Sequence, residues 1–471
     1  MIDFSNIKCV HCIGIGGIGL SAIADILLAK GYKVTGSDMN QSEKVEKLMK
    51  DGATVWLGHR AKNVAEADLL VYSSAVAQDN PEMVAAREKG IPCITRAEML
   101  GILMEGHKNS IAIAGTHGKT TTTSMISLIL KHAGKDPTIL VGGNLEELKG
   151  NVRVGGSEYF VTEACEYMDS FLQLRPKIEI ILNIDSDHLD YFKDIEHIVS
   201  SFDKFADLVP EDGLIMAYGA NPFVKRVIKG RSNVITYGFD ESNDYYADDI
   251  EFDGEGKPSF AIFHNKEKLV HMQLAVPGEH NLLNALVAAA CAHILGVEIA
   301  EIKKTLEEYT GTQRRFDILG ETVGGTRVID DYAHHPTEIH ATLKAAKNMK
   351  HNDIWCVFQP HTYTRTLALF DEFPAAFEDA DKVVLAEIYA AREKNIHKIS
   401  SKSLAKEIKH QYPDKEVYFF KDLHDIATFV YDNSEEGDLI MTMGAGDVYK
   451  VGEEILELDG KGQFKGEKIN D

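Results

Sequence analysis

The sequence has few cysteines, no long apolar run and fewer cations than anions. Its 471 residues include only six cysteines, which excludes a disulfide scaffold and favours a reducing compartment. No stretch approaches the roughly 18 uninterrupted apolar residues of a membrane span. The first residues, MIDFSNIK, lack the basic and apolar regions of a signal peptide. We therefore expect a cytoplasmic protein that does not insert into membranes.

Positive charge is scarce: 50 lysines and arginines stand against 73 aspartates and glutamates, for a net charge of −23. This balance argues against binding to nucleic acids or anionic membranes. It does not exclude anionic small molecules, because local loops and helix N-termini can override the net charge. Apolar residues make up 44% and charged residues 26% of the chain, which is typical of soluble globular proteins.

No Pro-rich or low-complexity linker interrupts the chain, and strand signals alternate with helix signals. At about 150 residues per domain, the length suggests roughly three domains. We predict an α/β protein: an N-terminal Rossmann-like domain at 1–107, a central P-loop-type mononucleotide-binding sheet at 108–312, and a C-terminal doubly wound sheet at 313–471. An antiparallel hairpin is expected within Glu251–Gln273, beside the central sheet. One long helix is expected over Thr366–Asp379.

Cys9 and Cys12 form a CxxC pair with His11 between them. A zinc or redox site needs a partner pair or an exposed loop, and the sequence shows neither. The pair lies in an apolar segment that reads as a buried strand, so packing in the core is the favoured interpretation.

A glycine-rich loop follows the first predicted strand. Gly14, Gly16 and Gly19 satisfy GxGxxG, and Gly17 adds a fourth glycine. Such a loop lets the backbone and a helix N-terminus approach a diphosphate. Asp38 follows the second strand, where a ribose hydroxyl is expected. Taken alone, the loop indicates a nicotinamide dehydrogenase, although it does not distinguish NAD from a nucleotide sugar, and a turn that binds nothing is the alternative.

A second glycine-rich loop, Gly115–Thr120, carries the GK[ST] end of a phosphate loop. It is a variant, because the strict GxxxxGK[ST] pattern requires glycine where this chain has Ile113. The groups that a phosphate loop needs are present nonetheless. They are exposed backbone amides, Lys119 for the β- and γ-phosphates, and the Thr120 hydroxyl for Mg²⁺. A strand before the loop and a Thr-rich helix after it argue against a chance glycine turn.

Magnesium in a phosphoryl-transfer site is held by one or two carboxylates. Glu163 and His188 each follow a predicted strand, and the carboxyl ends of parallel strands face the same crevice. The hypothesis is that Thr120 and Glu163 bind one Mg²⁺ and that His188 assists a second. The alternative ligands are Glu166, Asp185 and Asp187.

Taken together, nine motifs resemble the Mur ligase family, the ATP-dependent amide ligases of bacterial cell-wall synthesis. They span nearly the whole chain, in the order GIGGIGLS (14–21), GTHGKTTTT (115–123), EACE (163–166), NIDSDHLDYF (183–192), GEHNLLNALVA (278–288), RRFD (314–317), DDYAHHPTEI (330–339), FQPHTYTRT (358–366) and GAGDVY (444–449). The histidine in the second motif and the DDYAHHP segment are the most specific features. They are most similar to members that join L-alanine to UDP-N-acetylmuramate.

The resemblance implies a two-step reaction. The lactyl carboxylate of UDP-N-acetylmuramate attacks the γ-phosphate of ATP, and the amine of L-alanine then attacks the acyl phosphate and releases phosphate. It also implies three domains, for UDP-sugar, ATP and amino acid in that order. Lys119 and Mg²⁺ suit the first step because they neutralise charge on the γ-phosphate.

The resemblance also implies roles for individual residues. The UDP-sugar would be held by Gly14, Gly16, Gly17, Ile18, Gly19, Ser37, Asp38, Ser73 and Ser74. ATP would be held by Gly115, Thr116, His117, Gly118, Lys119, Thr120, Thr121, His280, Asn281, Asn284, Arg315 and Asp331. L-alanine would lie near Tyr332, His334 and Arg365, with Arg365 suited to its carboxylate. The catalytic set would be Lys119, Glu163, His188 and His334.

Two points stay open within the resemblance. His188, His334 or His335 could assist the second step, and the sequence does not assign a base. Several relatives carry a carbamylated lysine that supports Mg²⁺, but the alignment of the motif puts Phe202 there, with Lys204 two residues later. No carbamylated lysine is therefore predicted.

Three rival functions remain. A recycling ligase that attaches a murein tripeptide to the same UDP-sugar shares the histidine-containing loop and the AHHP segment. A nicotinamide-dependent dehydrogenase would leave the loop at Gly115–Thr120 unexplained. A non-catalytic nucleotide-binding regulator is the third. The protein is expected to be a monomer or a homodimer.

Overall fold

The computed structural model describes residues 4–73 and 75–462. Two compact units make up the chain. The first unit comprises Met1–Gly115, Thr122–Ile184 and Val199–Thr236, and the second comprises Thr116–Thr121, Asp185–Ile198 and Tyr237–Asp471.

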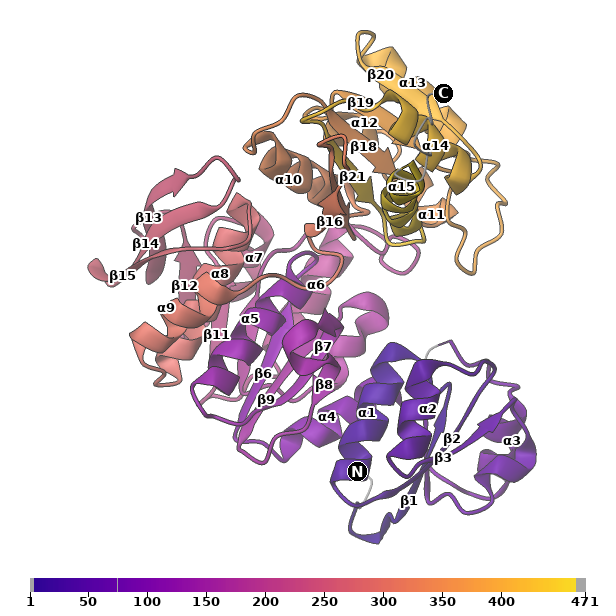
Figure 1. The fold of residues 1–471 in the computed structure, drawn as a ribbon. Coiled ribbons are helices and arrows are strands. Elements are labelled where there is room, and N and C mark those ends of the chain that lie inside the picture. Colours follow the sequence, from indigo (N-terminus) through magenta and orange to yellow (C-terminus); the bar gives the residue numbers. More distant parts are fainter. Residues whose placement is uncertain (1–3, 74, 463–471) are drawn as a thin grey trace, which may run out of the picture. The chain divides into compact units, whose positions relative to one another are not determined.

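The N-terminal sheet, in the first unit, has five parallel strands in the order β3-β2-β1-β4-β5 (Figure 1). Its strands are β1 (Cys9–Ile13), β2 (Lys33–Asp38), β3 (Thr54–Leu57), β4 (Leu69–Tyr72) and β5 (Cys93–Thr95). Its helices are η1 (Phe4–Asn6), α1 (Ile18–Ala29), α2 (Glu43–Lys50), η2 (Ala61–Val64), α3 (Pro81–Glu88) and α4 (Arg96–Glu105). All five residues of β1 are buried, as in a parallel sheet covered on both faces. Cys9 and Cys12 are free, buried thiols of β1, so they pack in the core as predicted.

The first unit also holds strands β6 to β11 and the first three residues of β12, in the order β12-β11-β10-β6-β9-β7-β8. The strands are β6 (Asn109–Ala114), β7 (Thr138–Leu145), β8 (Gly150–Arg153), β9 (Tyr159–Ala164), β10 (Ile178–Ile181), β11 (Leu214–Tyr218) and β12 (Val234–Gly238). The helices are α5 (Lys119–His132), η3 (Glu146–Leu148), η4 (Tyr167–Gln173), α6 (Ile195–Ala206) and α7 (Pro222–Ile228). Strands β6, β9, β10 and β11 pair in parallel, and β8 is antiparallel to β7.

The second unit contains the predicted antiparallel addition. It consists of β13 (Tyr245–Phe252), β14 (Pro258–His264) and β15 (Glu267–Gln273), so it is a three-stranded meander rather than one hairpin. The last two residues of β12, Tyr237 and Gly238, pair in parallel with the start of β13. Two helices follow, α8 (Glu279–Ile294) and α9 (Ile299–Glu308).

The C-terminal sheet has six strands in the order β16-β17-β21-β18-β19-β20. They are β16 (Asp317–Glu321), β17 (Arg327–Asp331), β18 (Ile354–Phe358), β19 (Lys382–Leu385), β20 (Glu416–Phe419) and β21 (Leu439–Met443). All pairs are parallel except that of the edge strand β16 with β17. The helices are α10 (Pro336–Lys347), α11 (Tyr363–Ala368), α12 (Phe373–Ala376), α13 (Ser401–Gln411), α14 (Leu423–Asn433) and α15 (Tyr449–Gly462).

The long helix expected over Thr366–Asp379 was wrong. The segment contains two short helices, α11 and α12, separated by a non-helical turn. Pro374 is the reason, because proline lacks an N–H for the helical ladder and disfavours helical geometry in the residue before it. It is tolerated here because it lies in the first turn of α12.

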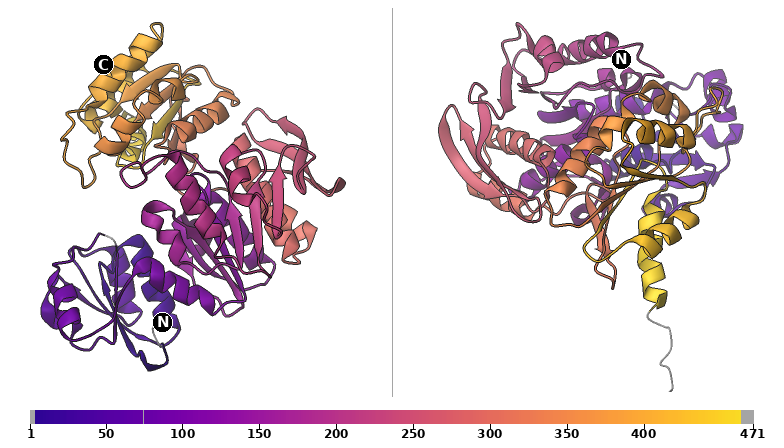
Figure 2. Two further views of the ribbon diagram at one scale, coloured as in Figure 1. Left: turned by 180° about the vertical axis from the view of Figure 1, so that it is seen from behind. Right: turned by 90° about the horizontal axis from the view of Figure 1, so that it is seen from above.

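Helices cover both faces of the C-terminal sheet, drawn from orange to yellow in Figures 1 and 2. Neighbouring strand residues point to opposite faces. In β17, Ile329 packs with residues of α10, α12 and α13, whereas Val328 packs with residues of α14 and α15. Because side chains from both faces are buried, this sheet is rigid enough to hold the loops that follow its strands.

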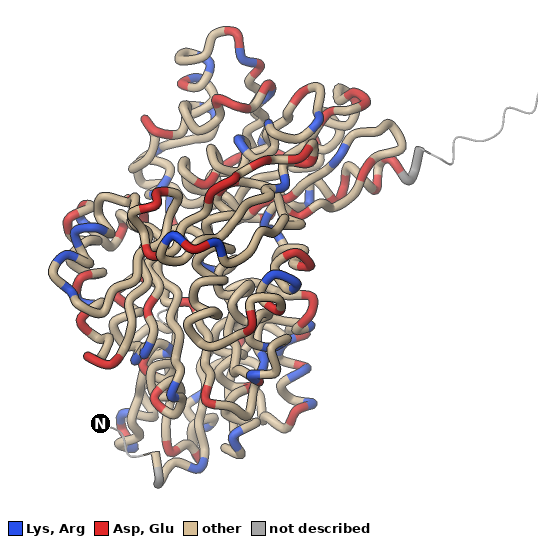
Figure 3. The backbone as a smooth tube through the Cα atoms, turned by 90° about the vertical axis from the view of Figure 1, so that its left-hand side faces the viewer, with Lys and Arg blue, Asp and Glu red and all other residues tan. Residues whose placement is uncertain are grey.

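The described surface is mixed in charge. Basic and acidic positions are interspersed along the described backbone (Figure 3), which has no long basic segment. Among the described helices, none combines the length and the apolar character that a membrane crossing requires.

Glu179 is an exception to the apolar interior of the first unit. It lies in β10, fully buried, and neither of its carboxyl oxygens has a hydrogen-bond partner among the described residues. Burial raises the pKa of Glu179 well above its usual value, and the positive charge of Arg231 offsets only part of this effect. The group is therefore protonated in the folded protein over a wider pH range than in the unfolded chain.

Replacing Glu179 by Gln removes the ionisable group and keeps its shape. Because folding raises the pKa of Glu179, its contribution is most favourable below the unfolded pKa of about 4.3 and is lost as the pH rises toward the folded pKa. We expect Glu179→Gln to match the wild type at pH 4 and to be more stable by about 1–3 kcal/mol at pH 8. Urea titrations at both pH values measure the free energy of unfolding. The exposed Glu211→Gln is the control, and an equal gain at both pH values contradicts the prediction.

Candidate active site

The first glycine loop closes on the end of β2. The N–H groups of Gly14 and Ile15 donate to the carbonyl of Ser37 at 2.8 and 3.1 Å, and the Gly16 N–H donates to Asp38 Oδ2 at 2.9 Å. A Cβ on Gly16 would lie 2.9 Å from that same oxygen, so the approach requires glycine. Asp38 is thus fixed at the rim of the loop, where the sequence placed it.

Ser37 is turned into the interior. Its side chain is fully buried, and its hydroxyl donates to Glu82 Oε2 at 2.5 Å and lies 2.9 Å from His59 Nδ1. The Ser37 hydroxyl is therefore already bonded within the protein, and the contact of Ser37 with a UDP-sugar stays a prediction. Ser73 follows β4 directly, and Ser74 lies outside the described residues.

A cavity of about 300 Å³ adjoins this loop within the first unit. Ile18 and Gly19 line it together with Glu163, which lies in β9. Arg96, the first residue of α4, also lines it, and its Nη1 would be 3.1 Å from a Cβ on Gly19. Sequence reasoning missed Arg96. The signal was a cation directly after the short strand β5, at the carboxyl edge where ligands bind.

Glu163 is held by the backbone in this cavity. Its Oε1 accepts the N–H of Gly142 at 2.6 Å, and a Cβ on Gly142 would lie 2.7 Å from both carboxyl oxygens. The carboxylate therefore has a fixed orientation.

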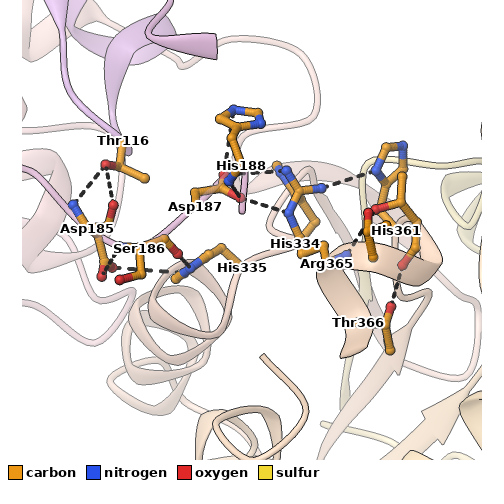
Figure 4. A network of polar contacts seen from close by, with 12 residues as sticks. Thr116, Asp185, Ser186, Asp187, His188, His334, His335, His361, Arg365 and Thr366 are labelled. Atoms are coloured by element: carbon orange, nitrogen blue, oxygen red, sulfur yellow. Dashed lines mark hydrogen bonds and ion pairs between the residues drawn. The ribbon is translucent and has the colours of Figure 1, made fainter. Parts of the chain in front are cut away.

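The phosphate loop turns sharply between β6 and α5. Gly115 and Gly118 have φ values of +140° and +85°, which strongly favour glycine. Helix α5 begins at Lys119, so its free amides face the loop. The Lys119 ammonium donates to the carbonyl of Thr116 at 3.0 Å, and the Thr116 hydroxyl accepts the N–H of Asp185 at 2.9 Å. Thr116 and Asp185 are both labelled in Figure 4.

His117, in the middle of that loop, lies between two carboxylates. Its Nε2 is 3.1 Å from Asp185 Oδ2, and its Nδ1 is 3.2 Å from Glu338 Oε1. Burial lowers the pKa of His117, but the hydrogen bonds to Asp185 and Glu338 outweigh it and raise the pKa to about 9. His117 is therefore an imidazolium near pH 7, with both nitrogens donating.

His117, Asp185 and His335 are close enough to resemble a metal site, with all three ligand atoms within 4.8 Å of one another. The hydrogen bonds argue against that interpretation. His335 Nε2 donates to the carbonyl of Ser186 at 2.8 Å (Figure 4). Its Nδ1 accepts the N–H of Thr337 at 3.3 Å. Both nitrogens of His117 also face carboxylate oxygens, so in this structure the cluster forms a network of hydrogen bonds and ion pairs.

Asp187 and Arg365 form the other buried ion pair of the site (Figure 4). Arg365 Nε donates to Asp187 Oδ1 at 2.9 Å, and Arg365 Nη1 donates to His361 Nδ1 at 3.3 Å. Burial raises the pKa of Asp187, but the Arg365 guanidinium outweighs this effect and holds that pKa well below its usual range. His188 follows with a positive φ of 54°, and its N–H donates to Asp187 Oδ1 at 2.6 Å. A backbone in this region is strained, which is common at functional sites.

His334 is a neutral imidazole. Burial is the main cause that lowers its pKa, to about 4. Its Nδ1–H donates to the carbonyl of Tyr332 at 2.9 Å, which leaves the lone pair on Nε2. Its ring centroid lies 6.0 Å from that of His361. Asp331, just before, accepts the N–H groups of Phe316 and Ala333 at 2.7 Å each, and burial raises its pKa to about 6.

The two arginines of RRFD differ in role. Arg314 is fixed: it donates to Asp330 Oδ2 at 2.9 Å and to the carbonyls of Gly444 and Gly446. Among the described residues, the side chain of Arg315 makes no hydrogen bond or ion pair, and its guanidinium lies 5.1 Å from the centre of the Tyr332 ring. Arg315, which is the arginine predicted to contact the nucleotide, therefore has side-chain N–H donors that are not used by the described residues.

Helix α8 carries the other predicted nucleotide residues in its first turns. Burial is the main cause that lowers the pKa of His280, to about 4. Asn281 Nδ2 donates to the carbonyl of Pro277 at 2.8 Å, and Asn284 Nδ2 lies 3.4 Å from Asn281 Oδ1.

The structure brings part of the predicted site together. The phosphate-loop residues 116–120, His188, His334 and Arg365 belong to the second unit and are joined through Asp185, Asp187 and Glu338. Glu163 and the predicted UDP-sugar residues belong to the first unit. Phe202 is buried in α6, with its ring 5.2 Å from that of Phe171.

Sequence reasoning also missed Glu338. It lies four residues after His334, at the third position of a helix whose first residue is Pro336. Acidic residues at that position usually serve the helix itself, so local pattern gave no reason to select it.

Three family models match consecutive parts of the chain. They are "Mur ligase family, catalytic domain" at residues 9–108, "Mur ligase middle domain" at 113–292 and "Mur ligase, glutamate ligase domain" at 314–446.

Curated relatives match nearly the full length. A UDP-N-acetylmuramate–L-alanine ligase of Caldanaerobacter subterraneus subsp. tengcongensis is 50% identical over 97% of this chain and 99% of its own. One of the same name from Alkaliphilus metalliredigens is 49% identical over 97% and 98%.

Solved structures match as well. UDP-N-acetylmuramate-alanine ligase MurC from Thermotoga maritima has a TM-score of 0.79 and 30% identity, covering 97% of this chain and 100% of that one. A murein peptide ligase from Psychrobacter arcticus has a TM-score of 0.70 and 26% identity, covering 96% and 99%.

Proposed function

The chain belongs to the Mur ligase family, and on that premise we propose that it joins L-alanine to UDP-N-acetylmuramate at the expense of ATP. The products are UDP-N-acetylmuramoyl-L-alanine, ADP and phosphate, and the role is in peptidoglycan synthesis. The 50% identity to a ligase of that name over nearly the whole chain carries the proposal. The cytoplasmic location and the monomeric or homodimeric state stay predictions.

The three substrates are assigned to three domains. The UDP-sugar goes to residues 1–107, ATP to 108–312 and the amino acid to 313–471. The phosphate loop and the first turn of α5 supply amides for the phosphates, which supports the ATP assignment. Arg365 and the neutral His334 lie in one buried network, which supports the amino-acid assignment.

Magnesium fits the proposed donors in part. The Thr120 hydroxyl and the Glu163 carboxylate are the hard oxygen ligands that Mg²⁺ prefers, and Glu163 is already oriented by the Gly142 amide. His188 offers a softer nitrogen, so its proposed role is secondary. When bound, the ion supplies positive charge beside the γ-phosphate.

The chain's own groups account for the rest of the chemistry. The Lys119 ammonium and the α5 N-terminus neutralise phosphate charge, so that an anionic carboxylate can approach the γ-phosphate. The amine must be neutral to attack the acyl phosphate. His334 Nε2 has a lone pair with which to accept a hydrogen bond from that amine. Its low pKa makes it a weak base, so the identity of the general base stays open among His188, His334 and His335.

Two rival functions are less well supported. The murein peptide ligase neighbour has lower identity and a lower TM-score than the alanine ligase neighbour, 26% and 0.70 against 30% and 0.79. A nicotinamide dehydrogenase leaves the phosphate loop and the His117 network without a role.

Phosphate release with every combination of the three substrates tests the proposal. We expect release only when UDP-N-acetylmuramate, ATP and L-alanine are all present. Release with the murein tripeptide in place of L-alanine would favour the recycling ligase. A change in NADH absorbance without phosphate release would indicate the dehydrogenase.

Replacing Glu163 by Gln tests the magnesium proposal. The amide oxygen can still accept the Gly142 N–H, so the local structure is kept, but the negative charge is lost. We expect phosphate release to fall by about 10³-fold or more, because charge stabilisation in phosphoryl transfer is removed. Calorimetry should show that UDP-N-acetylmuramate still binds. Glu158→Gln, just before the opposite end of β9, is the control, and unaltered turnover of Glu163→Gln refutes the assignment.

Replacing Arg365 by Ala tests the amino-acid site. We expect the KM for L-alanine to rise about tenfold or more, because a charge-assisted hydrogen bond to its carboxylate is lost. The KM for ATP should change much less. Initial rates with each substrate varied in turn measure both values. Arg231→Ala, another ion-paired arginine, is the matched control, and equal effects on both KM values would count against the assignment.

A further inference from the structure

Glu338 joins two segments that the proposed reaction uses at different steps. Its Oε1 lies 3.2 Å from His117 Nδ1 in the phosphate loop. Its Oε2 accepts the backbone N–H of His334 at 3.2 Å and lies 3.4 Å from the Nδ1 of the same residue. One carboxylate therefore contacts both the loop proposed to hold ATP and the segment proposed to hold the amino acid.

Helix capping does not explain this placement. Glu338 is the third residue of α10, where a glutamate commonly bonds the backbone N–H of the N-cap residue. Here the N-cap is His335, whose own ring accepts the N–H of Thr337. Glu338 instead reaches the residue before the N-cap and a loop more than 200 positions earlier in the chain. Support of the helix dipole needs only an exposed acid.

The contact is between charged, largely buried groups. The side chains of Glu338 and His117 are 15% and 14% exposed. Burial raises the pKa of Glu338, but the hydrogen bond to the His117 imidazolium and the positive charge of Arg315 outweigh it and hold that pKa well below its usual value. The low exposure limits solvent screening, so the pair is stronger than a surface ion pair.

We propose that Glu338 is a positioning residue that couples the phosphate loop to the amino-acid site, so that binding at one strengthens binding at the other. The inference rests on the proposed function. A nucleotide that orders the loop fixes His117, His117 fixes Glu338, and Glu338 holds the backbone of His334 in place. The backbone of His334 is then ordered before the amino acid binds, so amino-acid binding loses less conformational entropy. By linkage, the amino acid must strengthen nucleotide binding by the same factor.

Calorimetry on the full chain tests this. The dissociation constant of a non-hydrolysable ATP analogue with Mg²⁺ and saturating UDP-N-acetylmuramate is measured with and without L-alanine. In the wild type we expect L-alanine to tighten analogue binding about fivefold or more. In Glu338→Ala and in the isosteric Glu338→Gln, the ratio should fall below about twofold, and the KM for L-alanine should rise. His117→Asn should lose the same coupling, and adding it to Glu338→Gln should have little further effect.

Glu301→Ala is the matched control, because Glu301 is also an acid in the first turn of a helix, α9. It should keep the wild-type ratio. The inference is overturned if the wild type shows no coupling, if Glu338→Gln keeps it, or if Glu301→Ala loses it equally. Phosphate release by the wild type distinguishes failure of this inference from failure of the proposed function. If the wild type turns over and Glu338→Gln keeps the coupling, only the inference is refuted. If the wild type does not turn over with the three substrates, the proposed function is refuted.

Discussion

Parallel strands end at the same edge of a sheet, and this constraint decides where the functional residues of the chain stand. The glycine loop follows β1, the phosphate loop follows β6, and Asp331 is the last residue of β17. These strands belong to three different sheets, and each sheet needs helices on its faces, so several of the strands lead into a helix whose N-terminus points at the carboxyl edge of its own sheet. Backbone amides and a partial positive charge thus collect at each of these edges, in a chain whose net charge is −23.

Three acidic residues of the second unit are paired with cationic side chains. Asp185 and Glu338 share the imidazolium of His117, and Asp187 is paired with Arg365. An unpaired carboxylate in this position would repel phosphate and would be costly to bury. With these three acids paired within the protein, the Lys119 ammonium and the Arg315 guanidinium can contact the substrates in the proposed function. The distribution of ion pairs therefore explains how an acidic protein can present a cationic site.

Local sequence pattern predicted most of the fold and only part of the site. The buried strand that holds Cys9 and Cys12 was confirmed, because an apolar run is a local signal. The three-domain α/β class was confirmed too, whereas the boundaries at 107 and 312 and the roles of the site residues stay predictions. The helix predicted at Thr366–Asp379 failed because one proline outweighed the apolar spacing. The ion-pair partners of His117 and Arg365 were not visible, since they lie 68 to 221 positions away and no local pattern links them.

In the proposed function, the ion pair between Arg365 and Asp187 does not prevent Arg365 from binding the carboxylate of the amino acid. A guanidinium has five N–H donors, and three are used, by Asp187 through Nε and Nη2 and by His361 through Nη1. One donor on each Nη atom remains for an incoming carboxylate. Asp187 therefore need not be released when the amino acid binds. The pair instead fixes the plane of the guanidinium in advance, so less side-chain entropy is lost on binding than with a free arginine. By holding the guanidinium of Arg365 in place, the buried Asp187 thus helps Arg365 to recognise the carboxylate of the amino acid.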